Sequence, residues 1–342
     1  MSLALALAAA RTAQDANWYD PILRPPIGEW VAGFVDVITD VLRPVFDIIR
    51  AVFQGMYTGI DTVLTAPPFW AIILIAAALG WMLRGWVFGL GTVVGLLVIV
   101  GVEQWDNAMD TLALVIVASV IAIVLSVPLG ILAARSKVAS TIIRPILDFM
   151  QTMPAFVYLI PAIILFRVGV VPGIVATIVF AMAPGVRLTE LGIRNVDREV
   201  VEAGNAFGAS SWRILRQIQV PLAMPSISAG INQVIMLSLS MVVISGMVGA
   251  GGLGGEVVKS LSRIDIELGS EAGLSVVILA IFLDRLTSSI GGGRKRRKRA
   301  KPVVATQEPL DPSTGNAATQ TPDGAAGQAT APAAEQRSPQ PV

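Results

Sequence analysis

The 342-residue sequence contains no cysteine and no histidine. Without cysteine the chain cannot form a disulfide, a thiolate metal site or a cysteine nucleophile, and cysteine usage says nothing about its compartment. Without histidine it lacks the imidazole that serves in much acid–base catalysis and in most transition-metal sites. Much enzyme chemistry is therefore excluded at the outset, and we expect neither a catalytic residue nor a metal site.

Charged residues are also scarce, at 14% of the chain, whereas hydrophobic residues make up 54% and the mean hydropathy is +0.71. Soluble domains carry about a quarter charged residues, which cover their surface. The apolar excess of this chain must instead face lipid. We therefore predict an integral membrane protein.

Seven stretches carry almost no charge and are 17 to 27 residues long, which is enough for a membrane-spanning helix of about 17 to 25 residues. They are residues 67–83, 86–102, 111–134, 149–166, 168–186, 222–248 and 272–290. The sequence thus predicts an all-α, polytopic protein with about seven transmembrane helices.

Lys and Arg in the connections predict the orientation, because they favour the cytoplasmic side. They occur at Arg84, within 135–144, within 187–216 and in the basic run 294–299. These segments are predicted to be cytoplasmic, and the alternate connections extracytoplasmic. With seven spans, the N-terminus is then extracytoplasmic and the C-terminal tail cytoplasmic.

The first 66 residues form a separate amphipathic segment. From Asp36 onward, polar residues recur at spacings of three and four, which places them in one narrow stripe on a helix. Such a helix lies in the membrane interface, and Pro44 is expected to bend it. Residues 1–10 also resemble a short signal peptide, but they lack a basic start, so we favour an uncleaved N-terminus.

The tail at 291–342 is basic at its start and then rich in Pro, Ala, Gln, Thr and Gly. It has too few large apolar residues to form a core, which predicts disorder. Its basic run has two interpretations. It either anchors the chain to anionic membrane lipid, or it also responds to cytoplasmic ionic strength, because salt screens such contacts.

The connection 190–221 has the pattern of two short amphipathic helices separated by a break. Acidic residues at the start of the first helix suit its positive end, and Gly208 can adopt the left-handed conformation that ends it. Ser210 or Ser211 is a suitable cap for the second helix, which Pro221 is expected to end. We predict a stiff helical hairpin beneath the membrane.

The same connection resembles the EAA loop of ABC importer permeases, whose pattern is Glu-Ala-Ala, three residues, Gly, nine residues, Ile, one residue, Leu-Pro. The matching residues are Glu202, Ala203, Gly208, Ile218 and Pro221, and the departures, both conservative in size or character, are Gly204 and Val220. The resemblance implies that this loop, with the neighbouring Phe207, contacts an ATPase subunit. Glu202 has a second interpretation, as the i,i+4 partner of Arg198 within its own helix.

Residues 147–161, 230–244 and 278–286 are similar to the glycine betaine/proline betaine subfamily, so the resemblance covers roughly 67–290. It implies a type I ABC importer permease fold in 107–290, preceded by two accessory helices in 67–106. It also implies a permease homodimer in the cell inner membrane, two copies of an ATP-binding ABC subunit and an extracytoplasmic substrate-binding protein. The imported solute would be glycine betaine, proline betaine or a related osmoprotectant, or alternatively choline, carnitine or proline.

The chain itself is expected to bind no cofactor. It contains no Gly-x-x-x-x-Gly-Lys-Ser/Thr phosphate loop, so ATP and Mg must be used by the partner ATPase. We expect no nucleic-acid partner.

Candidate residues for the solute path are Met153, Pro154, Phe156 and Tyr158 in the fourth span and Asn232 in the sixth. Aromatic faces attract quaternary ammonium groups, which makes a cage one interpretation, but packing within the span is the alternative that we favour. Pro154 is expected to interrupt its helix. The pair Asp284 and Arg285 either faces the path or, as we favour, extends to the membrane interface.

Gly249, Gly251 and Gly254 match the Gly-x-Gly-x-x-Gly spacing of a dinucleotide site. We reject that interpretation, because such a site follows a strand and this run follows a predicted transmembrane helix. The glycines permit a tight external turn, and lining a gate is the alternative.

Two other function classes fit less well. One is a channel or ion-coupled secondary carrier without an ATPase. These spans have almost no buried acidic residues for proton or sodium coupling, and a carrier has no need of the hairpin. An intramembrane enzyme would need catalytic groups that the sequence does not offer.

Overall fold

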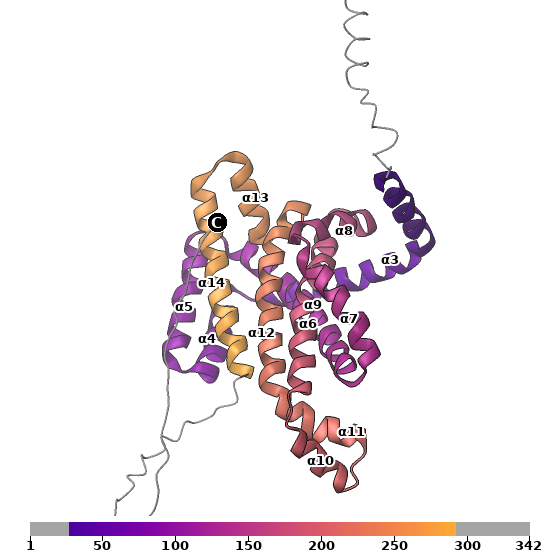
Figure 1. Ribbon diagram of the computed structural model, residues 1–342. Coiled ribbons are helices and arrows are strands. Elements are labelled where there is room, and N and C mark those ends of the chain that lie inside the picture. Colours follow the sequence, from indigo (N-terminus) through magenta and orange to yellow (C-terminus); the bar gives the residue numbers. More distant parts are fainter. Residues whose placement is uncertain (1–26, 292–342) are drawn as a thin grey trace, which may run out of the picture. The chain divides into compact units, whose positions relative to one another are not determined.

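The computed structural model describes residues 27–291, and every regular element in that part of the chain is helical (Figure 1). The elements are α3 (Ile27–Thr65), α4 (Phe69–Arg84), α5 (Trp86–Gly101), α6 (Trp105–Arg135), α7 (Lys137–Thr152), η1 (Ala155–Tyr158), α8 (Leu159–Phe166), α9 (Val170–Arg194), α10 (Arg198–Ala206), α11 (Ser211–Ile214), η2 (Leu215–Gln219), α12 (Val220–Ser245), η3 (Gly246–Val248), α13 (Gly252–Arg263) and α14 (Ile266–Gly291). The proposed signal-peptide alternative, the basic run and the tail beyond 291 lie outside the described residues.

The number of helices that can each cross a membrane differs from the predicted seven. Four helical segments are long and apolar enough: Trp105–Arg135, Val170–Arg194, Ser211–Val248 and Ile266–Ser289. The count rises to six if each of two sharply bent helix pairs forms one span. The first two predicted spans are the 16-residue helices α4 and α5, which turn at Gly85 and are shorter than an independent span requires.

The predicted span 149–166 is not one straight helix. The chain bends by 109° between α7 and the segment η1–α8. Met153 has extended backbone angles, as expected for a residue before proline, and Pro154 cannot donate a helical hydrogen bond. The sequence predicted that Pro154 interrupts the helix, but it did not predict a bend of this size.

The centre of the bundle consists of α6, α9 and α12, where small residues allow the helix backbones to approach closely. A methyl group added at Gly130 on α6 would lie 2.5 Å from Thr189 Cβ on α9. One added at Gly185 on α9 would lie 2.5 Å from Ser126 Oγ on α6. Membrane helices associate through such packing, because lipid provides little hydrophobic drive between them.

The amphipathic N-terminal segment is part of α3, a 39-residue helix that contains Pro44 and that Figure 1 shows curved. The ring of Phe46 packs edge-on against Phe166 of α8, with centroids 5.5 Å apart. Further along α3, Phe53 and Tyr57 pack against the main core. The second half of α3 is therefore attached to the bundle and is more than an interfacial anchor.

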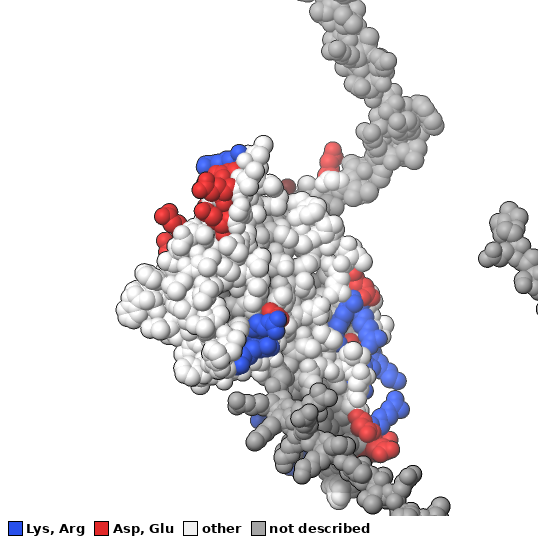
Figure 2. All heavy atoms as spheres, turned by 90° about the vertical axis from the view of Figure 1, so that its left-hand side faces the viewer, with Lys and Arg blue, Asp and Glu red and all other residues white. Residues whose placement is uncertain are grey.

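The bundle has two distinct ends. The end at α10 and α11 is called the hairpin end, and the other carries α13. Arg135 at the end of α6 shares a cavity with the hairpin, and Arg84 Nη2 donates to Ser288 Oγ at 2.5 Å near the end of α14. Figure 2 shows one face with a wide uncharged surface between a mainly acidic group at one extremity and basic side chains toward the other. This distribution suits a protein embedded in a membrane.

Candidate functional site

The first helix of the hairpin, α10, begins and ends at the residues that the sequence indicates. The Asp197 carboxylate accepts a hydrogen bond from Glu199 N at 3.0 Å, which caps the start of the helix. At its end, Gly208 has φ of +73°, the left-handed conformation that glycine adopts without strain. The Ser210 hydroxyl accepts from Arg213 N at 3.4 Å and caps α11. Local sequence signals therefore fix the fold of the hairpin.

The second helix does not end at Pro221, contrary to the sequence prediction. The chain is continuously helical from Ser211 to Val248. Within this helix, Leu215–Gln219 form a π-helical turn, η2, just before α12 and its Pro221. A π turn changes the hydrogen-bond spacing, so the missing amide and the ring of Pro221 are accommodated at the start of α12. The hairpin is consequently joined rigidly to the membrane helix α12.

The residues of the EAA-like pattern divide into two groups. Gly204 faces Ile218 and Ile214 across the hairpin, so these positions hold its two helices together. Phe207, in contrast, is 92% exposed, more than any other large apolar side chain in the described part of the chain. Glu202 and Ala203 are also exposed. The large apolar side chain of Phe207 therefore takes no part in the packing that holds the hairpin together.

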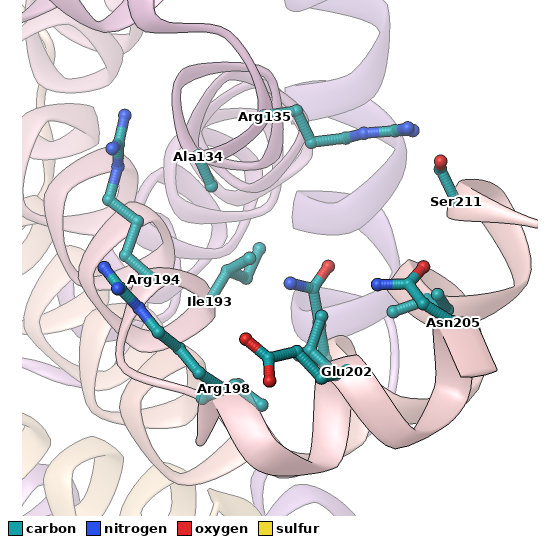
Figure 3. Close-up of a pocket in the computed structure, with 12 residues that line it drawn as sticks. Ala134, Arg135, Ile193, Arg194, Arg198, Glu202, Asn205 and Ser211 are labelled. Carbon is teal, nitrogen blue, oxygen red and sulfur yellow. The ribbon is translucent and has the colours of Figure 1, made fainter.

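A cavity of about 480 Å³ lies between the hairpin and the ends of α6 and α9. Arg135, Arg194, Arg198 and Glu202 line it, together with Asn205 and Ser211 (Figure 3). Among the described residues Glu202 forms no ion pair with Arg198. The geometry thus gives no support to the interpretation of Glu202 as an internal partner of Arg198.

The candidate path residues do not all come together. Met153, Pro154, Phe156 and Tyr158 lie at the bend between α7 and α8, where Phe156 is 56% exposed and Tyr158 is buried. The Tyr158 hydroxyl donates to the Met150 carbonyl, and its ring packs against Phe180 with centroids 6.2 Å apart. The two aromatic rings therefore have different environments, which favours packing over a cage.

Asn232 on α12 belongs to another contact. Its Oδ1 accepts a hydrogen bond from Thr287 Oγ1 at 2.5 Å, and its Nδ2 lies 3.4 Å from Asp284 Oδ1, both on α14. Asp284 also lies beside Arg285, with 3.9 Å between Oδ2 and Nε. Asn232 thus connects α12 to α14, and Asp284 has a polar partner within the bundle.

The glycine-rich run forms a tight turn before α13. Gly249 and Gly251 have φ of +78° and +79°. A methyl group added at Gly254 would lie 2.5 Å from the Val243 carbonyl oxygen on α12, so this position requires close backbone approach. Thr111 Oγ1 on α6 accepts from Leu253 N at 2.8 Å and fixes the start of α13. The structural role of the glycines accounts for their positions.

Sequence reasoning missed Glu190, which it treated only as the first residue of the connection 190–221. The structure places Glu190 inside α9, with 3% of the residue exposed, in contact with α7. In the sequence, Glu190 is visible only as an acidic residue between Arg187 and Arg194. That pattern does not reveal its contacts with Ser140 and Arg144 on α7.

Comparison with known proteins gives concordant matches. A family model described as "binding-protein-dependent transport system inner membrane component" matches residues 126–292. The chain is 44% identical to the glycine betaine/proline betaine transport system permease protein ProW of Escherichia coli, over 84% of this chain and 82% of that protein. It is 46% identical to the glycine betaine/carnitine transport permease protein GbuB of Listeria monocytogenes, over 77% and 95% respectively. An inward-facing structure of the MetNI methionine ABC transporter aligns with a TM-score of 0.51 and 22% identity, over 55% of this chain and 94% of that chain, and shows a shared fold.

Proposed function

The chain belongs to the inner membrane components of binding-protein-dependent transport systems, the permease subunits of ABC importers, and we propose that it carries glycine betaine, proline betaine or a related quaternary ammonium compatible solute. Membership makes it a non-catalytic subunit that works with a separate ATPase and a substrate-binding protein. The substrate class is supported by relatives that are 44% and 46% identical over most of both chains and bear the name of glycine betaine. Import of these solutes would protect the cell against osmotic stress.

The observation that carries the mechanism is the exposed hairpin that continues into α12. Glu202, Ala203, Phe207 and Gly208 would contact the ATPase, while Gly204, Ile218 and Pro221 would keep the hairpin rigid and joined to the membrane helix. Because α11, η2 and α12 form one continuous helix, a push on the hairpin is not absorbed in a loop. ATP-driven closure of the ATPase would thereby change the accessibility of the path.

The proposed assembly is a permease homodimer with two copies of the ATP-binding subunit. ATP and Mg bind to those subunits, and this chain binds no cofactor, in keeping with the lack of a phosphate loop in its sequence. Each copy of the permease would present one hairpin to one ATPase.

The hairpin end is proposed to be cytoplasmic, with the N-terminus and α13 on the extracytoplasmic side. Support comes from the connections that contain Lys and Arg, such as those at Arg135 and Arg194, which lie at the hairpin end. The substrate-binding protein would then dock at the α13 end, where the glycine turn at Gly249, Gly251 and Gly254 lies and could contribute to a gate.

Other solutes remain alternatives within the same mechanism. Carnitine is favoured among them, because GbuB of Listeria monocytogenes carries glycine betaine/carnitine in its name. Choline and proline are the further candidates from the sequence. An ion-coupled carrier is the least consistent alternative, since an exposed ATPase-type hairpin has no role in it.

Transport in proteoliposomes tests this proposal. The chain would be reconstituted with its cognate ATPase and binding protein, and uptake of radiolabelled glycine betaine measured with and without ATP. We expect uptake that requires ATP and is reduced by competing betaines, and competition by carnitine or choline ranks the alternatives. Uptake that follows an ion gradient without the ATPase would overturn the importer mechanism.

A further inference from the structure

One buried carboxylate joins the helices at the hairpin end of the bundle. The side chain of Glu190 on α9 is 4% exposed. Its Oε1 accepts hydrogen bonds from Ser140 Oγ at 2.8 Å and from Arg144 Nη2 at 2.9 Å, both on α7. Arg194 Nε, one turn further along α9, lies 2.9 Å from the same oxygen. These four residues are called the charged joint, and they leave no uncompensated charge on the buried carboxylate.

The two arginines fix the orientation of three helices. Arg144 Nε also donates to Glu190 Oε2 at 3.4 Å, so Arg144 contacts both carboxylate oxygens, which sets angle as well as distance. Arg194 Nη2 donates to the Ala133 carbonyl at 2.9 Å, in the last turn of α6, where carbonyls lack helical partners. Only Ser136, the cap of α7, separates α6 from α7. The ends of α6, α7 and α9 are therefore tied together.

The charged joint lies between the hairpin and the bend before α8. Arg194 is the last residue of α9, and α10 begins at Arg198. In the other direction, α7 runs from the joint to the 109° bend. The outer face of α7 is exposed, for example at Phe149, which is 66% exposed, so α7 depends on contacts of its inner face for its position. The joint is therefore a direct connection between α7 and the end of α9 that leads into the hairpin.

Resting on the proposed function, we propose that Glu190 is a positioning residue for transport, which passes movement of the hairpin from α9 to α7 and to the bend before α8. In this role its carboxylate would act through α7 and would not need to contact the solute or the ATPase. It keeps α7 in register with α9 while the hairpin moves, so that hydrolysis in the ATPase produces a change at the path.

The variant that tests this role is Glu190→Gln. Glutamine keeps the size of the side chain and an acceptor for Ser140 but removes the charge that holds Arg144 and Arg194. Those arginines are 57% and 34% exposed, so water can solvate them and the protein should still fold and insert. We expect the solute imported per ATP hydrolysed to fall about three- to tenfold, while ATPase activity persists.

A matched control lies on the same two helices. Arg187 on α9 pairs with Asp148 on α7, and their side chains are 39% and 66% exposed. Exposed pairs contribute little to stability or positioning. Asp148→Asn should therefore leave the ratio of solute to ATP unchanged, which separates the buried joint from any loss of charge between α7 and α9.

Variants of Arg144 provide a second, independent measurement. In Arg144→Gln, the buried Glu190 carboxylate keeps Ser140 and Arg194 as partners. This variant should therefore fold with Glu190 in place. We expect Arg144→Gln to lower the ratio, Arg144→Lys to restore most of it, and the double variant with Glu190→Gln to be no worse than either single variant. Additive losses in the double variant would contradict a shared joint.

Spin labels measure the position of α7 relative to α9 directly. The chain has no native cysteine, so labels attach to it only at introduced cysteines. Labels at Ile142→Cys on α7 and Leu191→Cys on α9 occupy exposed sites next to the joint. In the assembled transporter the shortest distance is the one between the two labels of a single protomer. We expect its peak to be narrow, to broaden in Glu190→Gln and to stay unchanged in Asp148→Asn. An unchanged distribution together with an unchanged solute-to-ATP ratio in Glu190→Gln would overturn the inference. Loss of ATP-dependent uptake in the unmodified transporter would instead count against the proposed function.

Discussion

Gly204 on α10 faces Ile218 in the π-helical turn so closely that a methyl group added at Gly204 would lie 2.9 Å from Ile218 Cδ1. Both residues occupy positions of the EAA pattern, in which alanine is usual where this chain has Gly204. The atom approached is the flexible end of the isoleucine side chain, so it can move by a few tenths of an ångström. The departure from the pattern is therefore a local packing adjustment.

Substitutions at Gly204 should show how large a side chain the contact with Ile218 can accommodate. Gly204→Ala gains about 0.5–1 kcal/mol of helix propensity. It displaces only the flexible end of the Ile218 side chain, so stability should change little. Gly204→Leu cannot fit and should open the hairpin, with ATPase binding lost. Thermal unfolding and co-purification of the ATPase measure the two effects, and equal behaviour of both variants would contradict the packing at Ile218.

The left-handed conformation of Gly208 makes a prediction that depends on the backbone alone. No atom lies within 4 Å of a methyl group added there, but φ is +73°. Gly208→Ala should therefore cost about 1–2 kcal/mol and reduce coupling to the ATPase, whereas Gly208→Asn should be milder, since asparagine tolerates this conformation. Gly208→Pro should insert normally and uncouple completely. Uptake and ATPase activity, measured together, would order the three variants.

The exposed surface of the hairpin should affect partner binding without affecting folding. Phe207→Ala and Glu202→Ala remove side chains that contribute little to the core, so thermal unfolding of the isolated permease should be unchanged. We expect ATP-dependent uptake and co-purification of the ATPase to fall strongly, and most strongly for Phe207→Ala. Normal uptake in both variants would exclude these side chains from the contact with the ATPase.

Thr111 supports a prediction at the opposite end of the bundle. Its hydroxyl donates to the Asn107 carbonyl at 2.7 Å and accepts from the buried amide of Leu253 at 2.8 Å. Thr111→Val leaves that amide without a partner and should destabilise the protein by about 1–3 kcal/mol. Thr141→Val is the matched control, because Thr141 is exposed and bonds only within its own helix. Denaturant unfolding in detergent compares the two.

Local chemistry explains why much of this protein can be predicted from its sequence. Long uncharged stretches require helices in lipid, Asp197 and Ser210 are strong caps, and Gly208 allows the left-handed turn between α10 and α11. The spacing from Glu202 to Pro221 was enough to indicate the permease family, which the comparisons show. Each of these signals lies within one continuous segment of the chain.

Contacts between distant segments decided what the sequence could not. Pro221 has the same local signal whether a helix ends there or a π turn carries the helix onward, and the structure shows that the helix continues. Asn232 could face a path or a neighbouring helix, and Thr287, 55 residues away, determines that it faces α14. Glu190 accepts hydrogen bonds from Ser140 and Arg144 on α7, and these contacts place it between two helices. The sequence alone determined which segments are helical and to which family the chain belongs. Only the packing of the helices determined that the buried Glu190 connects α9 to α7, because that contact joins residues far apart in the sequence.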